Sequence, residues 1–228
     1  MLRLGYSAPS DTKVILLMIG NLPGDELGPQ APRTVSRGRA FVYVLPCRDR
    51  DLVKVGLARD PLRRFVDLHR RFHAFFDLER GLLVAVDTVA QARALERTLQ
   101  VSVAPSRAAA PLETRAAAAG KTEWFAGIDP LVTAQARLLA TAGGHEVIAP
   151  LRAWLARRLG EHADRAYDWA ARLYEAMIEA QTYGQDARGV EDMLSLAIAR
   201  YAAVGLPVRT LMPEEVLRWY EERYELLD

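Results

Sequence analysis

Four side chains between residues 43 and 96, Tyr43, Lys54, Arg64 and Glu96, are of types that could do chemistry together. A phenol or an ammonium can transfer protons once its neighbours have shifted its pKa. An arginine presents a planar fork of donors that suits phosphate oxygens. A carboxylate on an apolar surface needs a cation or several hydrogen-bond donors beside it. These side chains can act jointly only if the fold brings them together.

The first element that positions them is a β-hairpin over residues 41–57, where two apolar runs flank a charged loop at residues 46–51. Symmetric pairing around that loop places Leu45 opposite Leu52, Tyr43 opposite Lys54 and Phe41 opposite Gly56. In this register the Cβ atoms of Tyr43 and Lys54 are about 5 Å apart. A cation at that range favours the phenolate, so we expect the pKa of Tyr43 to fall toward neutrality and make it a base.

A helix over about residues 61–74 follows, capped by Asp60 and opened by Pro61. One side is apolar, and the other side carries cationic and imidazole groups that either form a solvated face or contact nucleic acid. These groups are Arg59, Arg63, His69, Arg70 and Arg71. His69 and His73 are spaced i, i+4, but no third ligand lies nearby, so a surface or DNA contact is favoured over a metal site.

Residues 81–86 form a third, buried strand, and a capping box from Thr88 to Gln91 starts the next helix. Glu96 falls on the apolar stripe of that helix. The carboxylate therefore needs a partner, and two interpretations stay open. Glu96 either forms a salt bridge, for example to Arg64, or binds a cation.

Five groups of residues follow one another along the chain: Phe41, Val42 and Tyr43; Lys54, Val55 and Gly56; Arg64; Glu96; and Glu123, Trp124 and Phe125. In order and spacing, these groups resemble the GIY-YIG nuclease superfamily. The similarity is greatest to its phage and bacterial branch, whose domain closes on Glu-Trp-Phe. It spans residues 39–130. Two positions depart from the pattern: Lys54 stands where much of the superfamily has a tyrosine, and no asparagine lies near the end of the domain.

The resemblance implies an endonuclease that hydrolyses DNA phosphodiester bonds with a divalent metal, Mg²⁺ or Mn²⁺. Tyr43, Lys54 and Arg64 would be the catalytic residues: Tyr43 would help to deprotonate water, and Arg64 would neutralise charge on the phosphoryl oxygens. Glu96 would be the metal ligand, with water and substrate oxygens filling the remaining positions. Gly56, Glu123 and Trp124 would support the site.

The chain divides into three parts: an N-terminal extension and linker at residues 1–38, the nuclease-like domain at 39–130, and a helical domain at 131–228. We expect an α/β domain with a small three-stranded antiparallel sheet flanked by helices, followed by an all-α domain. Helices are predicted over about residues 130–142, 147–159, 161–182, 188–204 and 213–226, broken by glycines and Pro207.

The formal net charge is only +1, but residues 1–129 have more Lys and Arg than acidic residues, whereas residues 130–228 have more acidic residues. This asymmetry fits a DNA-binding domain joined to a module that packs, dimerises or binds a protein partner. Two other functions stay open: a DNA-binding module without catalysis, and a structural or protein-interaction protein.

The single cysteine, Cys47, excludes an intrachain disulfide and a cysteine-cluster zinc site, which favours the cytoplasm. The longest apolar run, residues 14–20, is too short to span a bilayer and lacks the flanks of a signal peptide. We expect no membrane association, and we interpret the run as a buried strand or a packing appendage.

Overall fold

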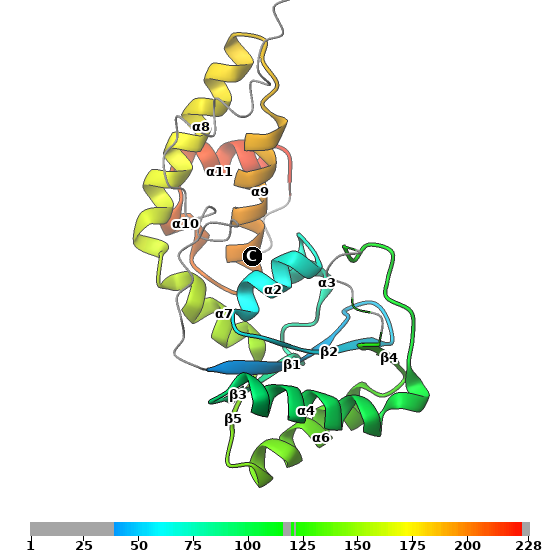
Figure 1. The fold of residues 1–228 in the computed structure, drawn as a ribbon. Helices are drawn as coiled ribbons and strands as arrows, with labels where there is room; N and C mark the ends of the chain where they lie inside the picture. Colours follow the sequence, from blue (N-terminus) through cyan, green and yellow to red (C-terminus); the bar gives the residue numbers. More distant parts are fainter. Residues whose placement is uncertain (1–38, 116–119, 121, 225–228) are drawn as a thin grey trace, which may run out of the picture. The chain divides into compact units, whose positions relative to one another are not determined.

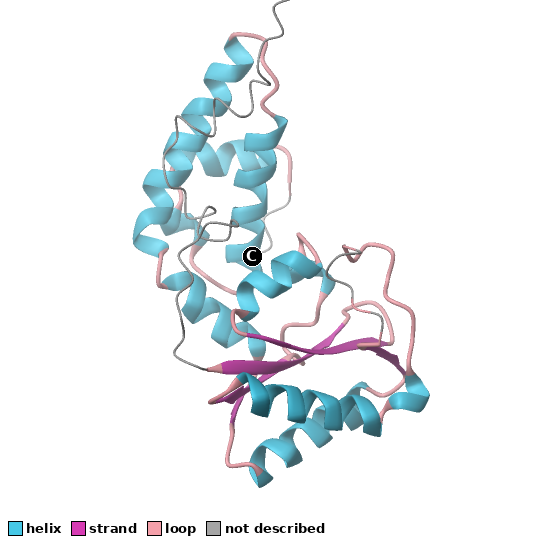
Figure 2. Ribbon diagram, in the orientation of Figure 1, coloured by secondary structure: helices cyan, strands magenta, loops and turns pink. Residues whose placement is uncertain are grey.

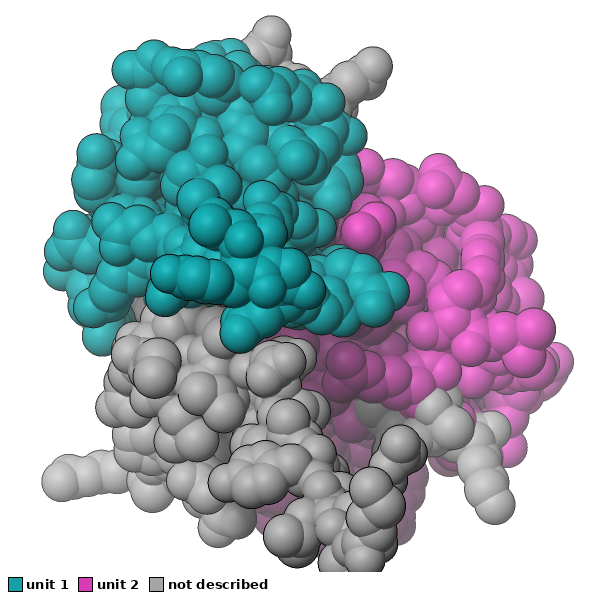
Figure 3. Space-filling model, turned by 90° about the horizontal axis from the view of Figure 1, so that it is seen from above, with its two compact units in different colours: residues 1–33, 159–228 teal, residues 34–158 magenta. Residues whose placement is uncertain are grey.

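The computed structural model describes residues 39–115, 120 and 122–224. The apolar run at residues 14–20 and the predicted extension and linker at residues 1–38 lie outside the described residues. The chain separates into two compact units, which Figure 3 colours differently. One unit contains the described residues up to Arg158, and the other contains those from Leu159 onward.

The first unit is built on a five-stranded antiparallel sheet in the order β4-β2-β1-β3-β5, so the chain has the predicted mixed α/β class (Figure 2). The strands are β1 (Ala40–Pro46), β2 (Leu52–Ala58), β3 (Leu82–Val86), β4 (Trp124–Ala126) and β5 (Glu146–Ile148). The prediction of three strands was too low because β4 and β5 have three residues each. Such short segments show no alternation that could reveal them.

The β1–β2 hairpin forms as predicted, but its register differs by two residues. Tyr43 lies opposite Gly56, and Lys54 lies opposite Leu45. Strand β1 continues through Pro46, and the backbone N–H of Cys47 donates to the Leu52 carbonyl at 2.8 Å. Proline fits there because its nitrogen faces the β3 side, where the β1–β3 ladder has already ended at Val44. The predicted pairing of Tyr43 with Lys54 is therefore wrong.

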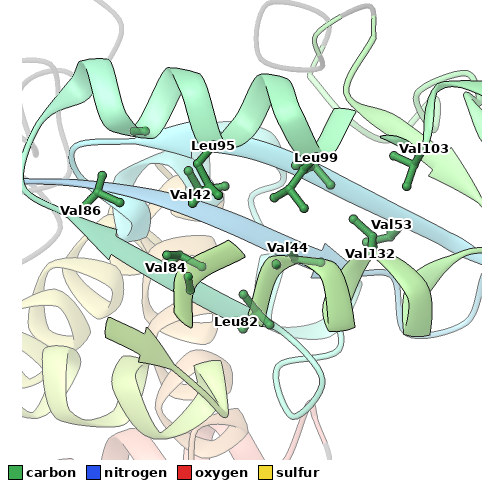
Figure 4. Packing of buried hydrophobic residues seen from close by; sticks show 14 of the residues in the cluster. Val42, Val44, Val53, Leu82, Val84, Val86, Leu95, Leu99, Val103 and Val132 are labelled. Carbon is green, nitrogen blue, oxygen red and sulfur yellow. The ribbon is translucent and has the colours of Figure 1, made fainter. Parts of the chain in front are cut away.

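One face of the sheet forms the main apolar core with two helices, α4 (Val89–Ser102) and α6 (Asp129–Ala142), as Figure 4 shows. Strand residues Val42, Val44 and Val84 meet Leu95 and Leu99 of α4. The predicted capping box of α4 is confirmed, since the Thr88 side chain accepts from the Gln91 N–H and the Gln91 side chain accepts from the Thr88 N–H.

The opposite face carries α2 (Pro61–Leu68) and α3 (Phe72–Phe75), which lie across the sheet from α4 and α6 in Figure 1. Asp60 caps α2 and Pro61 opens it, as predicted. The helix ends at Leu68 rather than near Ala74, because His69 has an extended backbone with φ −152°. The chain restarts as the short α3, and this break brings Phe72 to within 6.0 Å of the Phe65 ring, measured between centroids.

The first unit extends beyond residue 130, where the sequence placed the start of an all-α domain. Helix α6 packs into the core, β5 adds an edge strand, and α7 (Leu151–Gly160) sets Trp154 against Phe41 with ring centroids 6.2 Å apart. The helices predicted beyond residue 130 largely agree with those in the structure. The first of these helices, α6, packs on the sheet because its apolar side chains complete the core there.

The second unit consists of helices around a core that includes Trp169, Leu173, Leu194, Ile198 and Trp219. The elements are η3 (Ala163–Arg165), α8 (Ala166–Thr182), α9 (Arg188–Ala203), α10 (Val208–Leu211) and α11 (Glu214–Glu221). The predicted break at Gly184 is confirmed, and its φ of +67° is one that glycine adopts without strain. Among the described residues, no helix has the length and apolar character needed to cross a membrane.

Candidate active site

Tyr43 is the central side chain of the candidate site and is fully buried. Its ring lies over Gly56 on the neighbouring strand and meets Phe65 of α2 edge to face, with centroids 5.6 Å apart. The Arg64 Nε–H donates a 3.3 Å hydrogen bond to the phenolic oxygen. Helix α2, which is capped at Asp60, therefore positions the Arg64 guanidinium next to the Tyr43 hydroxyl.

Burial raises the pKa of Tyr43 to about 12, although the charge and hydrogen bond of Arg64 act in the opposite direction. The expected fall toward neutrality is therefore wrong. That expectation placed Lys54 directly across from the phenol, and the observed register places Gly56 there instead. At neutral pH, Tyr43 is a neutral phenol that accepts a hydrogen bond from Arg64.

Lys54 is fully buried, lies opposite Trp124 of β4, and points to the same face of the sheet as Tyr43. Its Nζ donates a 2.7 Å hydrogen bond to Glu123 Oε2 and lies 5.1 Å from the centroid of the Trp124 ring. Burial lowers the pKa of Lys54, whereas the bond to Glu123 acts to raise it. The partner of the Lys54 ammonium is thus a carboxylate and an indole, both supplied by the Glu-Trp-Phe segment.

Glu96 reaches the same cluster from α4, on the other side of the sheet. It is half-buried, and its pKa is raised first by burial and then by the charge of Glu123, while Lys54 and Arg64 act to lower it. These mutual electrostatic effects place Glu96 and Glu123 close to the two cations. The structure therefore brings together Tyr43 of β1, Lys54 of β2, Arg64 of α2, Glu96 of α4 and Glu123, which directly precedes β4.

Glu96 lies near two cationic side chains, Lys54 and Arg64, whose charges act to lower its pKa. Within residues 39–115, 120 and 122–224, no ion pair to Glu96 occurs, whereas Lys54 is paired with Glu123. A half-buried carboxylate with a raised pKa gains from a nearby cation. No group of three or more His, Cys, Asp or Glu side chains in this described part could hold a metal. The protein would thus supply few ligands, an arrangement that Mg²⁺ tolerates because it retains water.

The predicted nucleic-acid contacts are not members of this cluster. Arg59, Arg70 and Arg71 are exposed, and Arg63 is half-buried on α2. His69 ends α2 and stacks on Phe75, with ring centroids 4.4 Å apart. His73 is buried on α3, so the i, i+4 histidine pair predicted for a single helix does not form.

The predicted supporting residues have structural roles in the cluster. Gly56 leaves room for the Tyr43 ring, since a Cβ atom there would lie 2.6 Å from the Tyr43 Cζ. Trp124 is buried, stacks on Phe76 with centroids 6.3 Å apart, and contacts the Lys54 ammonium. Sequence reasoning missed that Glu123 is the partner of Lys54. No local signal in the sequence reveals this pairing, because it depends on the three-residue strand β4 lying beside β2.

Comparisons with protein-family models, curated proteins and solved structures found no match to this chain.

Proposed function

We propose that the protein is a metal-dependent endonuclease of the GIY-YIG kind that hydrolyses DNA phosphodiester bonds. The observation that carries the proposal is the contact between Arg64 and Tyr43, with Glu96 close enough to affect both electrostatically. The Arg64 guanidinium, held beside the phenol of Tyr43, is suited to stabilise negative charge on a phosphoryl group. The nearby Glu96 carboxylate, with its raised pKa, is suited to bind a cation. The exposed arginines Arg59, Arg70 and Arg71 are suited to hold the DNA backbone.

In this proposal Arg64 is the principal catalytic group. Its Nε–H donates to Tyr43, which orients the guanidinium, and the positive charge of this group can neutralise charge on the phosphoryl oxygens. Lys54 positions Glu123 through their 2.7 Å hydrogen bond. Glu96 would hold a divalent metal, which when bound would supply electrophilic stabilisation of the leaving oxygen.

The role of Tyr43 as a proton acceptor requires the phenolate. Because the pKa of Tyr43 is about 12, only a small fraction is deprotonated at neutral pH. As long as the pH is below the pKa, the deprotonated fraction grows tenfold for each unit by which the pH rises. We therefore expect cleavage that uses this residue to accelerate as the solution becomes alkaline.

The decisive test is the cleavage of supercoiled plasmid by the full chain with Mg²⁺ or Mn²⁺, compared with its Glu96→Gln variant. Glutamine keeps the size of glutamate and removes the charge, so we expect cleavage to fall at least about a hundredfold. Glu179→Gln, at an exposed site on α8, is the matched control and should cleave like the parent. If Glu96→Gln cleaves plasmid at the parental rate, Glu96 is not part of the active site.

The competing function is a DNA-binding module that retains the fold and the basic surface without catalysis. Two observations favour it: the Tyr43 pKa of about 12, and the engagement of Lys54 by Glu123. Salt-sensitive retention of DNA without any metal-dependent nicking of plasmid would support this function over the nuclease. The absence of both would leave a structural or protein-interaction protein.

For the second unit we propose a protein partner or a second copy of the chain. Three exposed apolar side chains on α8 and just after it support this proposal: Tyr167, Ile178 and Tyr183 are 50%, 42% and 72% exposed. A change in molar mass measured by light scattering upon Tyr167→Ser and Ile178→Ser would identify the second copy as the partner. An unchanged monomeric mass in the parent and the variant would point to a different protein.

A further inference from the structure

A stack of three side chains, Arg50, Phe75 and His69, lies apart from the Tyr43 cluster. The His69 imidazole is nearly parallel to the Phe75 ring, at 14° with centroids 4.4 Å apart. The Arg50 guanidinium carbon lies over the same ring, 5.7 Å from its centroid. His69 and Phe75 are half-buried, and the Arg50 side chain is 43% exposed. The stack is therefore partly open to solvent and is not a core element.

Each end of the stack is held in place by a further contact. Glu113 accepts hydrogen bonds from both terminal nitrogens of Arg50, and the bond from Nη1 is 2.9 Å long. The Arg71 backbone N–H donates to His69 Nδ1 at 3.1 Å. Because Nδ1 accepts this bond, the neutral imidazole carries its proton on Nε2. The planar groups are thus oriented before any ligand binds.

The charges around the stack favour binding of a polyanion that carries planar groups. Burial lowers the pKa of His69, so the imidazole is uncharged at neutral pH and presents an aromatic face. Arg50 lowers the pKa of Glu113 to about 2, and the two charges offset each other. Further exposed cationic side chains lie near the stack: Arg71 and Arg115 act electrostatically on His69, Arg48 bonds to the backbone of His73 and Phe75, and Arg70 follows His69 in the chain.

A continuous path of ring contacts joins the stack to the candidate active site. Phe75 meets Phe76 edge to face at 4.9 Å, Phe76 stacks on Trp124 at 6.3 Å, and Trp124 contacts the Lys54 ammonium at 5.1 Å. Phe76 and Trp124 are fully buried, so the rings form a rigid connection. A strand bound at the stack would thus lie at a fixed position relative to Lys54 and its neighbours.

We propose that the Arg50–Phe75–His69 stack binds an unpaired nucleobase, so that the preferred substrate is DNA with a single-stranded segment beside the site. The inference rests on the proposed function in assuming a DNA ligand. Bases within a duplex are stacked on one another and cannot reach a side-chain stack, whereas unpaired bases stack on aromatic and guanidinium planes. The surrounding arginines then hold the backbone of the same strand.

The test measures binding of the full chain to three fluorescent DNAs at one salt concentration. They are a single-stranded oligothymidine, a duplex, and a duplex with a single-stranded overhang. We expect the overhang DNA to bind more tightly than the duplex. His69→Ala should weaken binding of the two DNAs with unpaired bases by about tenfold to a hundredfold, and leave duplex binding unchanged. The salt dependence should not change, because His69 is uncharged.

Two further variants separate stacking from loss of structure or charge. His69→Phe retains an aromatic plane and should bind like the parent, whereas Arg50→Gln should lose affinity for unpaired DNA. Arg97→Gln on α4 removes the same charge at an exposed site elsewhere and should not change the preference. Equal losses for duplex and overhang DNA, or His69→Phe behaving like His69→Ala, would overturn the inference.

The outcome is separable from that of the proposed function. Glu96→Gln should retain the preference for unpaired DNA while losing cleavage. A parent protein that prefers unpaired DNA through His69 but nicks no plasmid would keep this inference and reject the nuclease. Cleavage without any preference for unpaired DNA would reject this inference and keep the nuclease.

Discussion

The Tyr43 ring lies directly over the Cα atom of Gly56, so close that a Cβ atom at residue 56 would be 2.6 Å from the Tyr43 Cζ. This contact follows from the hairpin register, in which the two residues are opposite each other. Gly56→Ala therefore has to displace the phenol or the strand. We expect it to lower the free energy of unfolding by about 1–3 kcal/mol, measured by chemical denaturation.

The matched control for Gly56→Ala is Gly160→Ala. A Cβ atom at Gly160 would meet only Leu206 Cδ2, at 3.7 Å, which is ordinary van der Waals contact. Residue 160 lies at the end of α7, where alanine is well tolerated. Equal stabilities of the parent and Gly56→Ala would show that the Tyr43 ring does not rest on residue 56.

The ionisation of Tyr43 should appear in the dependence of stability on pH. The folded protein holds the phenolic proton with a pKa of about 12, above the ordinary value of 10.0. The resulting contribution to stability is complete below pH 10 and is lost as the pH rises toward 12. We expect the stability difference between the parent and Tyr43→Phe to shrink over that range.

Ultraviolet absorbance of the phenolate gives an independent measurement of the same group. The difference between the titrations of the parent and Tyr43→Phe should contain one ionisation at about 12. Lys54→Met should leave this ionisation nearly unchanged, because the ammonium is bound to Glu123 and Tyr43 is opposite Gly56. A Tyr43-dependent ionisation near neutral pH would contradict the assignment.

The Lys54–Glu123 ion pair should respond unequally to removal of its two partners. The Lys54 side chain is 0% exposed, whereas the Glu123 side chain is 26% exposed. Glu123→Met removes the hydrogen-bonded carboxylate from a fully buried ammonium and should cost about 3–5 kcal/mol, while Lys54→Met leaves a carboxylate that water can reach and should cost less.

A double-mutant cycle of these two substitutions isolates the interaction. The double variant should be more stable than Glu123→Met alone, since it no longer contains the buried ammonium. Thermal unfolding of the four proteins provides the comparison. Strictly additive effects would mean that the 2.7 Å hydrogen bond contributes no coupling to stability.

Arg64→Ala should reduce turnover far more than DNA affinity, because the guanidinium is proposed to act on charge that develops in the transition state. Arg70→Ala and Arg71→Ala should do the opposite, weakening binding and lowering its salt dependence while leaving turnover at saturating DNA near the parental value. Single-turnover cleavage and binding titrations would distinguish the two classes. The same ratio of effects at all three positions would make the arginines one undifferentiated basic surface.

Local patterns in the sequence determined much of the fold. Asp60 and Pro61 mark the start of α2, Thr88 and Gln91 mark the start of α4, and two apolar runs around a charged loop mark the hairpin. These signals could be recognised because each depends on residues only a few positions apart, whose steric and hydrogen-bonding preferences act within one turn.

The tertiary structure alone decided how those elements combine. The hairpin register depended on Pro46 remaining in β1, which was possible because β3 ends its pairing before that residue. The partner of Lys54 depended on β4, a three-residue strand whose place beside β2 is set by contacts across 69 residues of sequence between Lys54 and Glu123. The pKa of Tyr43 depended on burial beneath α2. Each of these is a long-range property, because packing and desolvation depend on what surrounds a side chain in space rather than along the chain.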